Sequence, residues 1–226
     1  MRNNSYSISS AVPTSRISAI NTNKLIRNTY MLLSMTLLFS AVVTGFAVVT
    51  RAPILPWWMV LLVSWGLLFL TNSLRNSATG LIAVFALTGF LGYTLGPIVG
   101  FYLRLPNGHQ IVATAMGGTG VIFLGLSAYA LTTRKDFSFM GGFLMVGLLV
   151  AILAGIGAIL FQIPALSLAM SAMVVLLMSG FILYDTSAMI HGGEDNYIMA
   201  TINLYLNIYN LFTSLLQISG FLGSDD

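Results

Sequence analysis

Residues 137–184 read FSFMGGFLMVGLLVAILAGIGAILFQIPALSLAMSAMVVLLMSGFILY, which is 48 residues without one charged side chain. As a single helix this stretch would be about 72 Å long, more than twice the roughly 30 Å of a bilayer's hydrocarbon core. Gln162, Ile163 and Pro164 fall near its middle. Because proline disfavours helix at the residue before it, the stretch predicts two membrane-spanning helices joined by a tight turn.

Charged residues divide the rest of the chain into intervals that each fit one span. Arg27, Arg51 and Arg75 are separated by two intervals of 23 uncharged residues, and intervals of 28, 29 and 29 follow Arg75, Arg104 and Asp195. A spanning helix needs about 20 apolar residues. The sequence therefore predicts seven helices, approximately at residues 29–49, 54–74, 79–102, 109–132, 139–161, 165–190 and 196–222.

The composition indicates a membrane protein. Of the 226 residues, 57% are hydrophobic and 7% are charged, whereas soluble domains have about a quarter charged. The mean hydropathy is +0.92. The net charge of +3 comes from basic residues spread singly, unlike a nucleic-acid-binding patch. The expected fold is an all-α, seven-helix bundle solvated by the lipid bilayer, with no nucleic-acid partner.

The basic residues predict how the chain is oriented in the membrane. Arg51 and Arg104 fall on one side, and seven basic residues fall on the other: Arg2, Arg16, Lys24, Arg27, Arg75, Arg134 and Lys135. Since loops rich in Lys and Arg stay in the cytoplasm, the N-terminus should be cytoplasmic and the C-terminus periplasmic. Residues 1–23 are rich in Ser, Asn and Thr, and we expect a disordered tail there, followed by a transmembrane domain over residues 24–226.

Polar residues recur along one face of the last predicted helix: Asn203, Asn207, Asn210, Ser214 and Gln217. Their spacing of four, three, four and three is that of a heptad. An unpaired amide facing lipid costs several kcal/mol, so we expect the stripe to point into the bundle and the last helix to be central. The stripe is then either a set of interhelical hydrogen bonds or a hydrated path for an ion or proton.

Asp185 is the one acidic residue predicted to lie within a span. It falls about 7.5 Å inside the cytoplasmic end of the sixth helix. A carboxylate at this depth needs a partner, and Arg75, at the end of the second helix, is the nearest cation by depth. The pair is expected to be either a structural latch or a gate that loosens when Asp185 is protonated.

Small residues mark the third helix. Gly92, Gly96 and Gly100 share one face at four-residue spacing, and Pro97 follows the second of them. Such glycines let another backbone approach closely, which favours a packing role. The alternative is that Gly96 and Pro97 form a hinge.

No pattern predicts an enzyme. The chain lacks cysteine, a serine elbow, a paired carboxylate dyad and a Walker sequence. His191 and Glu194 could ligate a metal, but His109 is expected on the opposite membrane face, and zinc sites use three or more protein ligands. We expect no catalytic residues, no metal and no cofactor.

Four stretches together resemble a known family. They are residues 23–41 (NKLIRNTYMLLSMTLLFSA), 87–98 (LTGFLGYTLGPI), 131–142 (LTTRKDFSFMGG) and 182–215 (ILYDTSAMIHGGEDNYIMATINLYLNIYNLFTSL). The chain resembles bacterial members of the Bax inhibitor-1 family, in the YccA branch. The resemblance implies a seven-helix bundle with the last helix at its centre.

For the YccA branch, the resemblance further implies an inner-membrane protein that associates with the ATP-dependent protease FtsH and the membrane regulators of that protease. Such a protein is a slow substrate that restrains degradation of other membrane proteins. The N-terminal tail, with Arg2, Arg16 and Lys24, would be the handle that the protease engages.

Other relatives are described as pH-sensitive calcium leak channels that sense pH with two aspartates. Asp185 matches the first aspartate, whereas the second position, in the pattern YLxxxNLF, is Asn207. Asparagine does not titrate, so a two-carboxylate sensor cannot form. Calcium or proton leak is therefore the alternative function, with the FtsH-modulator function preferred.

Overall fold

The computed structural model describes residues 14–161 and 164–223, and this part of the chain contains seven α-helices and no strand. The helices are α1 (Thr14–Val49), α2 (Trp57–Leu74), α3 (Thr79–Leu103), α4 (Gly108–Thr133), α5 (Gly141–Phe161), α6 (Pro164–His191) and α7 (Tyr197–Leu222). A short 3-10 helix, Ser138–Met140, precedes α5. The predicted all-α bundle is confirmed.

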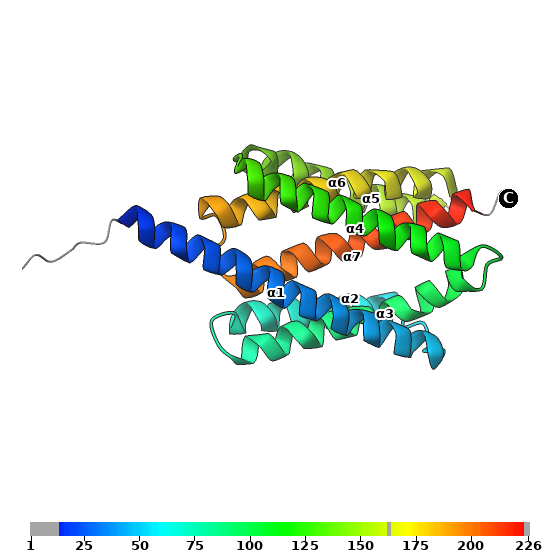
Figure 1. The fold of residues 1–226 in the computed structure, drawn as a ribbon. Helices are drawn as coiled ribbons and strands as arrows, with labels where there is room; N and C mark the ends of the chain where they lie inside the picture. The colour runs from blue at the N-terminus through cyan, green and yellow to red at the C-terminus, as the bar shows by residue number, and fades with distance from the viewer. Residues whose placement is uncertain (1–13, 162–163, 224–226) are drawn as a thin grey trace, which may run out of the picture.

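The helices form two layers with α7 between them. Figure 1 shows α1, α2 and α3 on one side, α4, α5 and α6 on the other, and α7 running obliquely through the middle. Helix α7 packs against α1, α3, α4 and α6, whereas α2 packs mainly on α3 and α5 on α6. The expectation that the last helix is central is therefore confirmed.

Within the described part of the chain, six helices, all except α7, are long and apolar enough to cross a membrane. The outer helices α2 and α5 carry large apolar side chains that are strongly exposed, including Trp65, Phe69 and Leu153. Lipid is the solvent that such surfaces fit. Helix α7 is more polar but runs the length of the bundle. Figure 1 shows that α1 begins at one end of the molecule and α7 finishes at the other.

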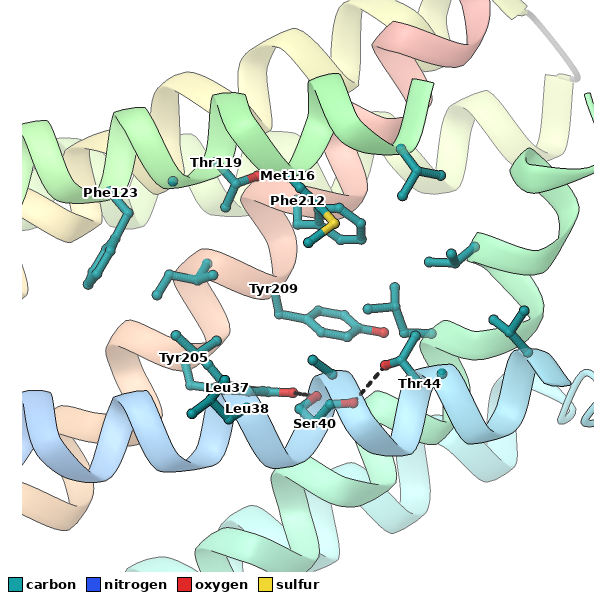
Figure 2. Close-up of a pocket in the computed structure, with 18 of the residues that line it drawn as sticks. Leu37, Leu38, Ser40, Thr44, Met116, Thr119, Phe123, Tyr205, Tyr209 and Phe212 are labelled. Atoms are coloured by element: carbon teal, nitrogen blue, oxygen red, sulfur yellow. Dashed lines mark hydrogen bonds between the residues drawn. The ribbon is translucent and has the colours of Figure 1, made fainter. Parts of the chain in front are cut away.

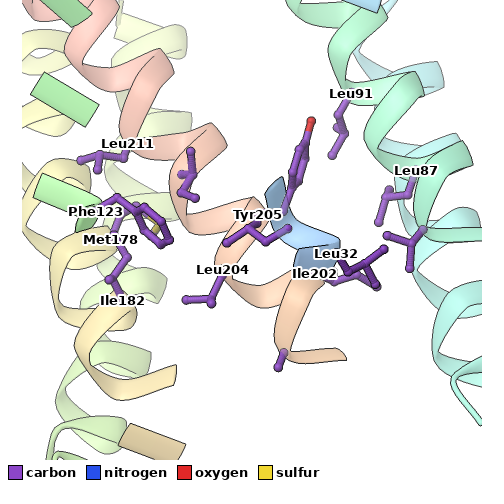
Figure 3. Packing of buried hydrophobic residues seen from close by; sticks show 14 of the residues in the cluster. Leu32, Leu87, Leu91, Phe123, Met178, Ile182, Ile202, Leu204, Tyr205 and Leu211 are labelled. Carbon is purple, nitrogen blue, oxygen red and sulfur yellow. The ribbon is translucent and has the colours of Figure 1, made fainter. Parts of the chain in front are cut away.

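Buried apolar residues pack against α7 on two opposite sides. Figure 3 shows Leu204 and Leu211 directed towards Met178 and Ile182 of α6, while Ile202 and Tyr205 face α1 and α3. Lipid tails are as apolar as leucine, so burial between helices in a membrane gains little from the hydrophobic effect. Close packing and interhelical hydrogen bonds therefore decide where α7 lies.

The first helix is longer than predicted. Helix α1 begins at Thr14, whereas the sequence predicted a first helix from residue 29 and a tail over residues 1–23; residues 1–13 lie outside the described part of the chain. Residues 14–23 contain neither glycine nor proline. Once a helix is nucleated, each further residue adds a hydrogen bond at small cost, so nothing in this segment stops α1 at the membrane surface.

The junction between α6 and α7 is set by local backbone chemistry. Gly192 follows the last residue of α6 with φ of 82°, a conformation that glycine adopts without steric cost. The amide of Gly193 then donates to the Ala188 carbonyl at 2.8 Å and closes the helix. Asn196 begins α7 by accepting from the amides of Ile198 and Met199 at 3.0 and 3.2 Å.

Candidate functional site: polar contacts of the central helix

Asp185 and Asn207 form a direct contact between α6 and α7. The Asn207 amide donates to Oδ2 of Asp185 at 2.6 Å. Asn207 is 7% exposed, and Asp185 is partly buried. A hydrogen bond to a carboxylate is stronger than one between neutral groups, so this contact is well suited to hold the two helices together inside a membrane.

Arg75 is not the partner of Asp185. It is exposed at the C-terminal cap of α2, and the described residues contain no ion pair between it and Asp185. Its carbonyl instead accepts from the Asn196 side chain at 3.0 Å, and that side chain also donates to Asn76 at 2.9 Å. The prediction paired Asp185 with Arg75 because of their similar depth in the membrane. Similar depth does not fix how far apart two residues lie in the plane of the membrane.

The polar stripe on α7 does not point entirely into the bundle. Asn207 and Ser214 are buried, but Asn203 is only partly buried and Asn210 is exposed. The Asn210 amide donates to the Leu206 carbonyl of its own helix at 2.8 Å. Asn210 therefore bonds within α7, unlike Asn207 and Gln217, which bond to α6.

Gln217 continues the connection to α6 near the other end of the helix. Ser171 donates to the Gln217 side-chain oxygen at 2.7 Å, and the Gln217 nitrogen donates to Ser167. With Asn207 and Asp185, these contacts join α6 and α7 at two levels of the membrane. Interhelical hydrogen bonding, one of the two interpretations of the stripe, therefore describes Asn207 and Gln217.

A second set of contacts, absent from the sequence-based prediction, ties α7 to α1 and α3. Ser40 on α1 and the Tyr205 hydroxyl lie 2.6 Å apart, and that hydroxyl donates to the Thr88 carbonyl of α3 at 3.2 Å. Thr201 of α7 also donates to the Thr29 carbonyl of α1 at 3.3 Å. The sequence contains one signal that could have predicted these contacts: residues with hydroxyl groups lie on the side of α7 opposite the asparagines.

The glycines of α3 differ in their surroundings. A Cβ on Gly92 would lie 2.6 Å from the Ser40 carbonyl oxygen, and one on Gly96 would collide with the Ala47 side chain, whereas one on Gly100 would meet nothing within 4 Å. Helix α3 continues through Pro97. The contacts of Gly92 and Gly96 fit the packing interpretation, and the hinge stays a prediction.

Polar groups also join the loops at the end of the bundle where α6 finishes. Ser187 of α6 accepts from the Phe137 amide at 3.0 Å and donates to the Lys135 carbonyl at 3.2 Å. In the same loop, the Ser138 amide donates to Asp136 at 2.9 Å, which lowers the pKa of this exposed carboxyl. These contacts secure the loop between α4 and α5 against α6.

The residues predicted as a protease handle lie at the start of the chain. Lys24 is exposed on α1, Arg16 lies in the first turn of the same helix, and Arg2 lies outside the described residues. Within the described residues, no group of three His, Asp or Glu side chains is placed to hold a metal ion.

Comparison with known proteins shows the family to which this chain is related. A family model described as Inhibitor of apoptosis-promoting Bax1 matches residues 22–225, almost the whole chain. The chain belongs to the Bax inhibitor-1 family. The resemblance of the four stretches is confirmed, and so is the seven-helix architecture that it implied.

Several Bax inhibitor-1 relatives match over nearly their full lengths. Modulator of FtsH protease YccA from Escherichia coli is 50% identical over 210 residues, covering 93% of this chain and 95% of YccA. An uncharacterised protein from Pseudomonas aeruginosa is 52% identical over the whole of both chains. A membrane protein from Vibrio cholerae is 47% identical over 208 residues, covering 92% of this chain and 93% of that protein.

Within this family, the contact between α6 and α7 has a clear chemical character here. It joins one carboxylate, Asp185, to one amide, Asn207. The amide neither gains nor loses a proton near neutral pH, so the pair holds one titratable group and not two. Whether a latch or a gate, the role predicted for Asp185 therefore involves one titratable group in this contact.

Proposed function

We propose that this protein is an inner-membrane modulator of an FtsH-type ATP-dependent protease, and a slow substrate of it. The observation that carries the proposal is the 50% identity to Modulator of FtsH protease YccA over nearly all of both chains. The corresponding protein of a second E. coli strain is named an inner membrane protein, which supports the same location here. Catalysis by the chain itself plays no part.

The length of α1 supplies a physical basis for engagement by the protease. Its 36 residues extend over about 54 Å, well beyond a hydrocarbon core of roughly 30 Å. Figure 1 shows the N-terminal part of α1 projecting past the other helices. With residues 1–13 before it, this projection would present Arg2, Arg16 and Lys24 to a cytoplasmic ATPase if the N-terminus is cytoplasmic, as the basic residues predict.

The hydrogen bonds of α7 support slow degradation. A protease that pulls on α1 must separate it from α3 and α7, where Ser40, Thr29 and Tyr205 are engaged. Behind them, Asn207 and Gln217 fasten α7 to α6. A bundle joined across both layers resists local unfolding, so the protease would remain occupied for longer than with a loosely packed client.

Crosslinking in native membranes tests the association. Cells that produce the tagged protein at its natural level are treated with a membrane-permeable crosslinker, and the tagged complexes are purified and analysed by mass spectrometry. The proposal predicts that the protease hexamer is recovered with the protein. Recovery of the protein without the protease, while a known protease partner is captured in parallel, would contradict it.

A calcium or proton leak is the second candidate, and the exposure of Asn210 favours it. The Asn210 side chain is exposed near the middle of α7, so it would place a polar group near the centre of the membrane. Purified protein in liposomes loaded with a calcium dye tests the leak directly. Flux that depends on Asp185 would support a channel, and absence of flux at acidic and neutral pH would exclude this function.

A further inference from the structure

The bundle contains a cavity of about 630 Å³ between α1, α3, α4 and α7. Figure 2 shows Leu37 and Leu38 of α1, Met116 and Phe123 of α4, and Tyr209 and Phe212 of α7 arranged around it. Helix α6, which carries Asp185, contributes none of the walls. The cavity is therefore separate from the contact between Asp185 and Asn207.

The walls of this cavity suit an apolar ligand. Its hydroxyl groups already have partners, because Ser40 and Tyr205 bond to each other and Thr44 donates to the Gly92 carbonyl at 2.9 Å. Thr119 likewise donates to the Ala115 carbonyl at 2.7 Å. Among the described residues, no charged side chain lines the space. A polar ligand would lose hydration without gaining equivalent hydrogen bonds.

The cavity opens sideways towards lipid. Its rim includes Leu38 and Val49 of α1 and Met116 of α4, which are 69%, 83% and 60% exposed. Helices α1 and α4 do not pack along each other in the described structure. Because these rim residues lie on helices that are long and apolar enough to cross a membrane, we expect the opening to face lipid.

The volume distinguishes an acyl chain from a protein helix. A membrane-spanning α-helix is about 10 Å wide and about 30 Å long, which is too large for a cavity of about 630 Å³ to hold over its full length. An empty space of this size would forfeit the packing contacts of every side chain around it. A lipid tail is narrow, flexible and already present at the opening.

We propose that an acyl chain of a bilayer phospholipid enters between α1 and α4 and binds in this cavity against Ile208, Tyr209 and Phe212 of α7. The bound chain completes the contact between the two layers on the side where α1 and α4 are apart. This site is independent of protease binding, and it makes the lipid a component of the folded bundle.

Photolabelling with lipid tests the site. The full-length protein is reconstituted in liposomes that contain a phosphatidylethanolamine with a diazirine at the end of one acyl chain, and labelled residues are identified by mass spectrometry after irradiation. We expect labels on Ile208, Tyr209 or Phe212, in addition to the lipid-facing residues of the outer helices. Labelling confined to outward-facing residues would overturn the proposal.

Two glycines that line the cavity are positions at which it can be filled. A Cβ on Gly45 of α1 or Gly120 of α4 meets nothing within 4 Å, and both residues line the cavity. Gly45→Phe and Gly120→Phe should abolish the labels on α7. Gly66→Phe is the matched control, because Gly66 is equally open but lies on α2 away from the cavity.

If one of these variants fails to fold, the labelling pattern of the wild-type protein still tests the proposal. Each variant is first checked for a thermal unfolding transition in detergent. Labels on α7 that persist in the folded Gly45→Phe and Gly120→Phe variants, or that disappear equally in Gly66→Phe, would contradict a chain bound in the cavity.

Discussion

At the scale of single residues, the contact between Asp185 and Asn207 joins a carboxylate of α6 to an amide of α7. The sequence indicated that Asp185 needs a partner and pointed to Arg75. A sequence reveals how deep a residue lies in the membrane, but not where the residue lies around the bundle. The structure places Asn207 within 2.6 Å and leaves Arg75 exposed. The partner of a buried carboxylate is decided by the rotation of neighbouring helices, which tertiary packing sets.

Asn207→Leu should lower the free energy of unfolding by about 1–3 kcal/mol, because it leaves the Asp185 carboxylate without its hydrogen-bond donor. Asn210→Leu is the matched control. It removes the same amide from an exposed site where, within the described residues, the side chain bonds to the Leu206 carbonyl of its own helix, so we expect little change. Unfolding in detergent, followed by circular dichroism, compares the two, and equal losses would refute the assigned role of Asn207.

At the scale of helices, the sequence predicted six of the seven elements to within a few residues. Uncharged intervals and Pro164 sufficed, since spanning helices must satisfy their backbone hydrogen bonds internally. The start of α1 was missed because its first turns are polar, and the polarity of a segment does not show where a helix ends. Asn207 and Ser214 of the α7 stripe are buried, as the spacing predicted, whereas Asn210 is exposed.

The packing of α3 on α1 gives a second prediction. Gly96→Ala should destabilise the bundle by about 1–3 kcal/mol, because the added methyl group collides with Ala47 and forces the two helices apart. Gly100→Ala, on the same face of the same helix, meets open space and should change the stability by less than about 0.5 kcal/mol. Thermal unfolding in detergent measures both, and similar effects would argue against close packing at Gly96.

The N-terminal segment gives a third prediction. Removing residues 2–13 leaves the described part of α1 intact, and the bundle should keep its unfolding temperature. If this segment is the handle, the half-life of the protein in cells that contain the protease should lengthen, while crosslinking to the protease persists through the membrane helices. An unchanged half-life would show that the protease engages another part of the chain.

At the scale of the whole molecule, the two ends of the described chain lie at opposite ends of the bundle (Figure 1). An odd number of crossings places the termini on opposite sides of the membrane. With the basic residues in the short loops, we expect the N-terminus in the cytoplasm and the C-terminus in the periplasm. A C-terminal alkaline phosphatase fusion should be active and a C-terminal green fluorescent protein fusion dark; the reverse would invert the orientation and remove the α1 projection from the reach of a cytoplasmic ATPase.

The central claim is that this folded bundle restrains an FtsH-type protease by occupying it. The most direct measurement reconstitutes the purified protease in liposomes with ATP and a loosely packed membrane client, and follows degradation of the client as this protein is added. The account predicts that the client survives longer with each addition, while this protein is itself degraded more slowly than the client. A client degradation rate that stays constant at every amount of added protein would contradict the account.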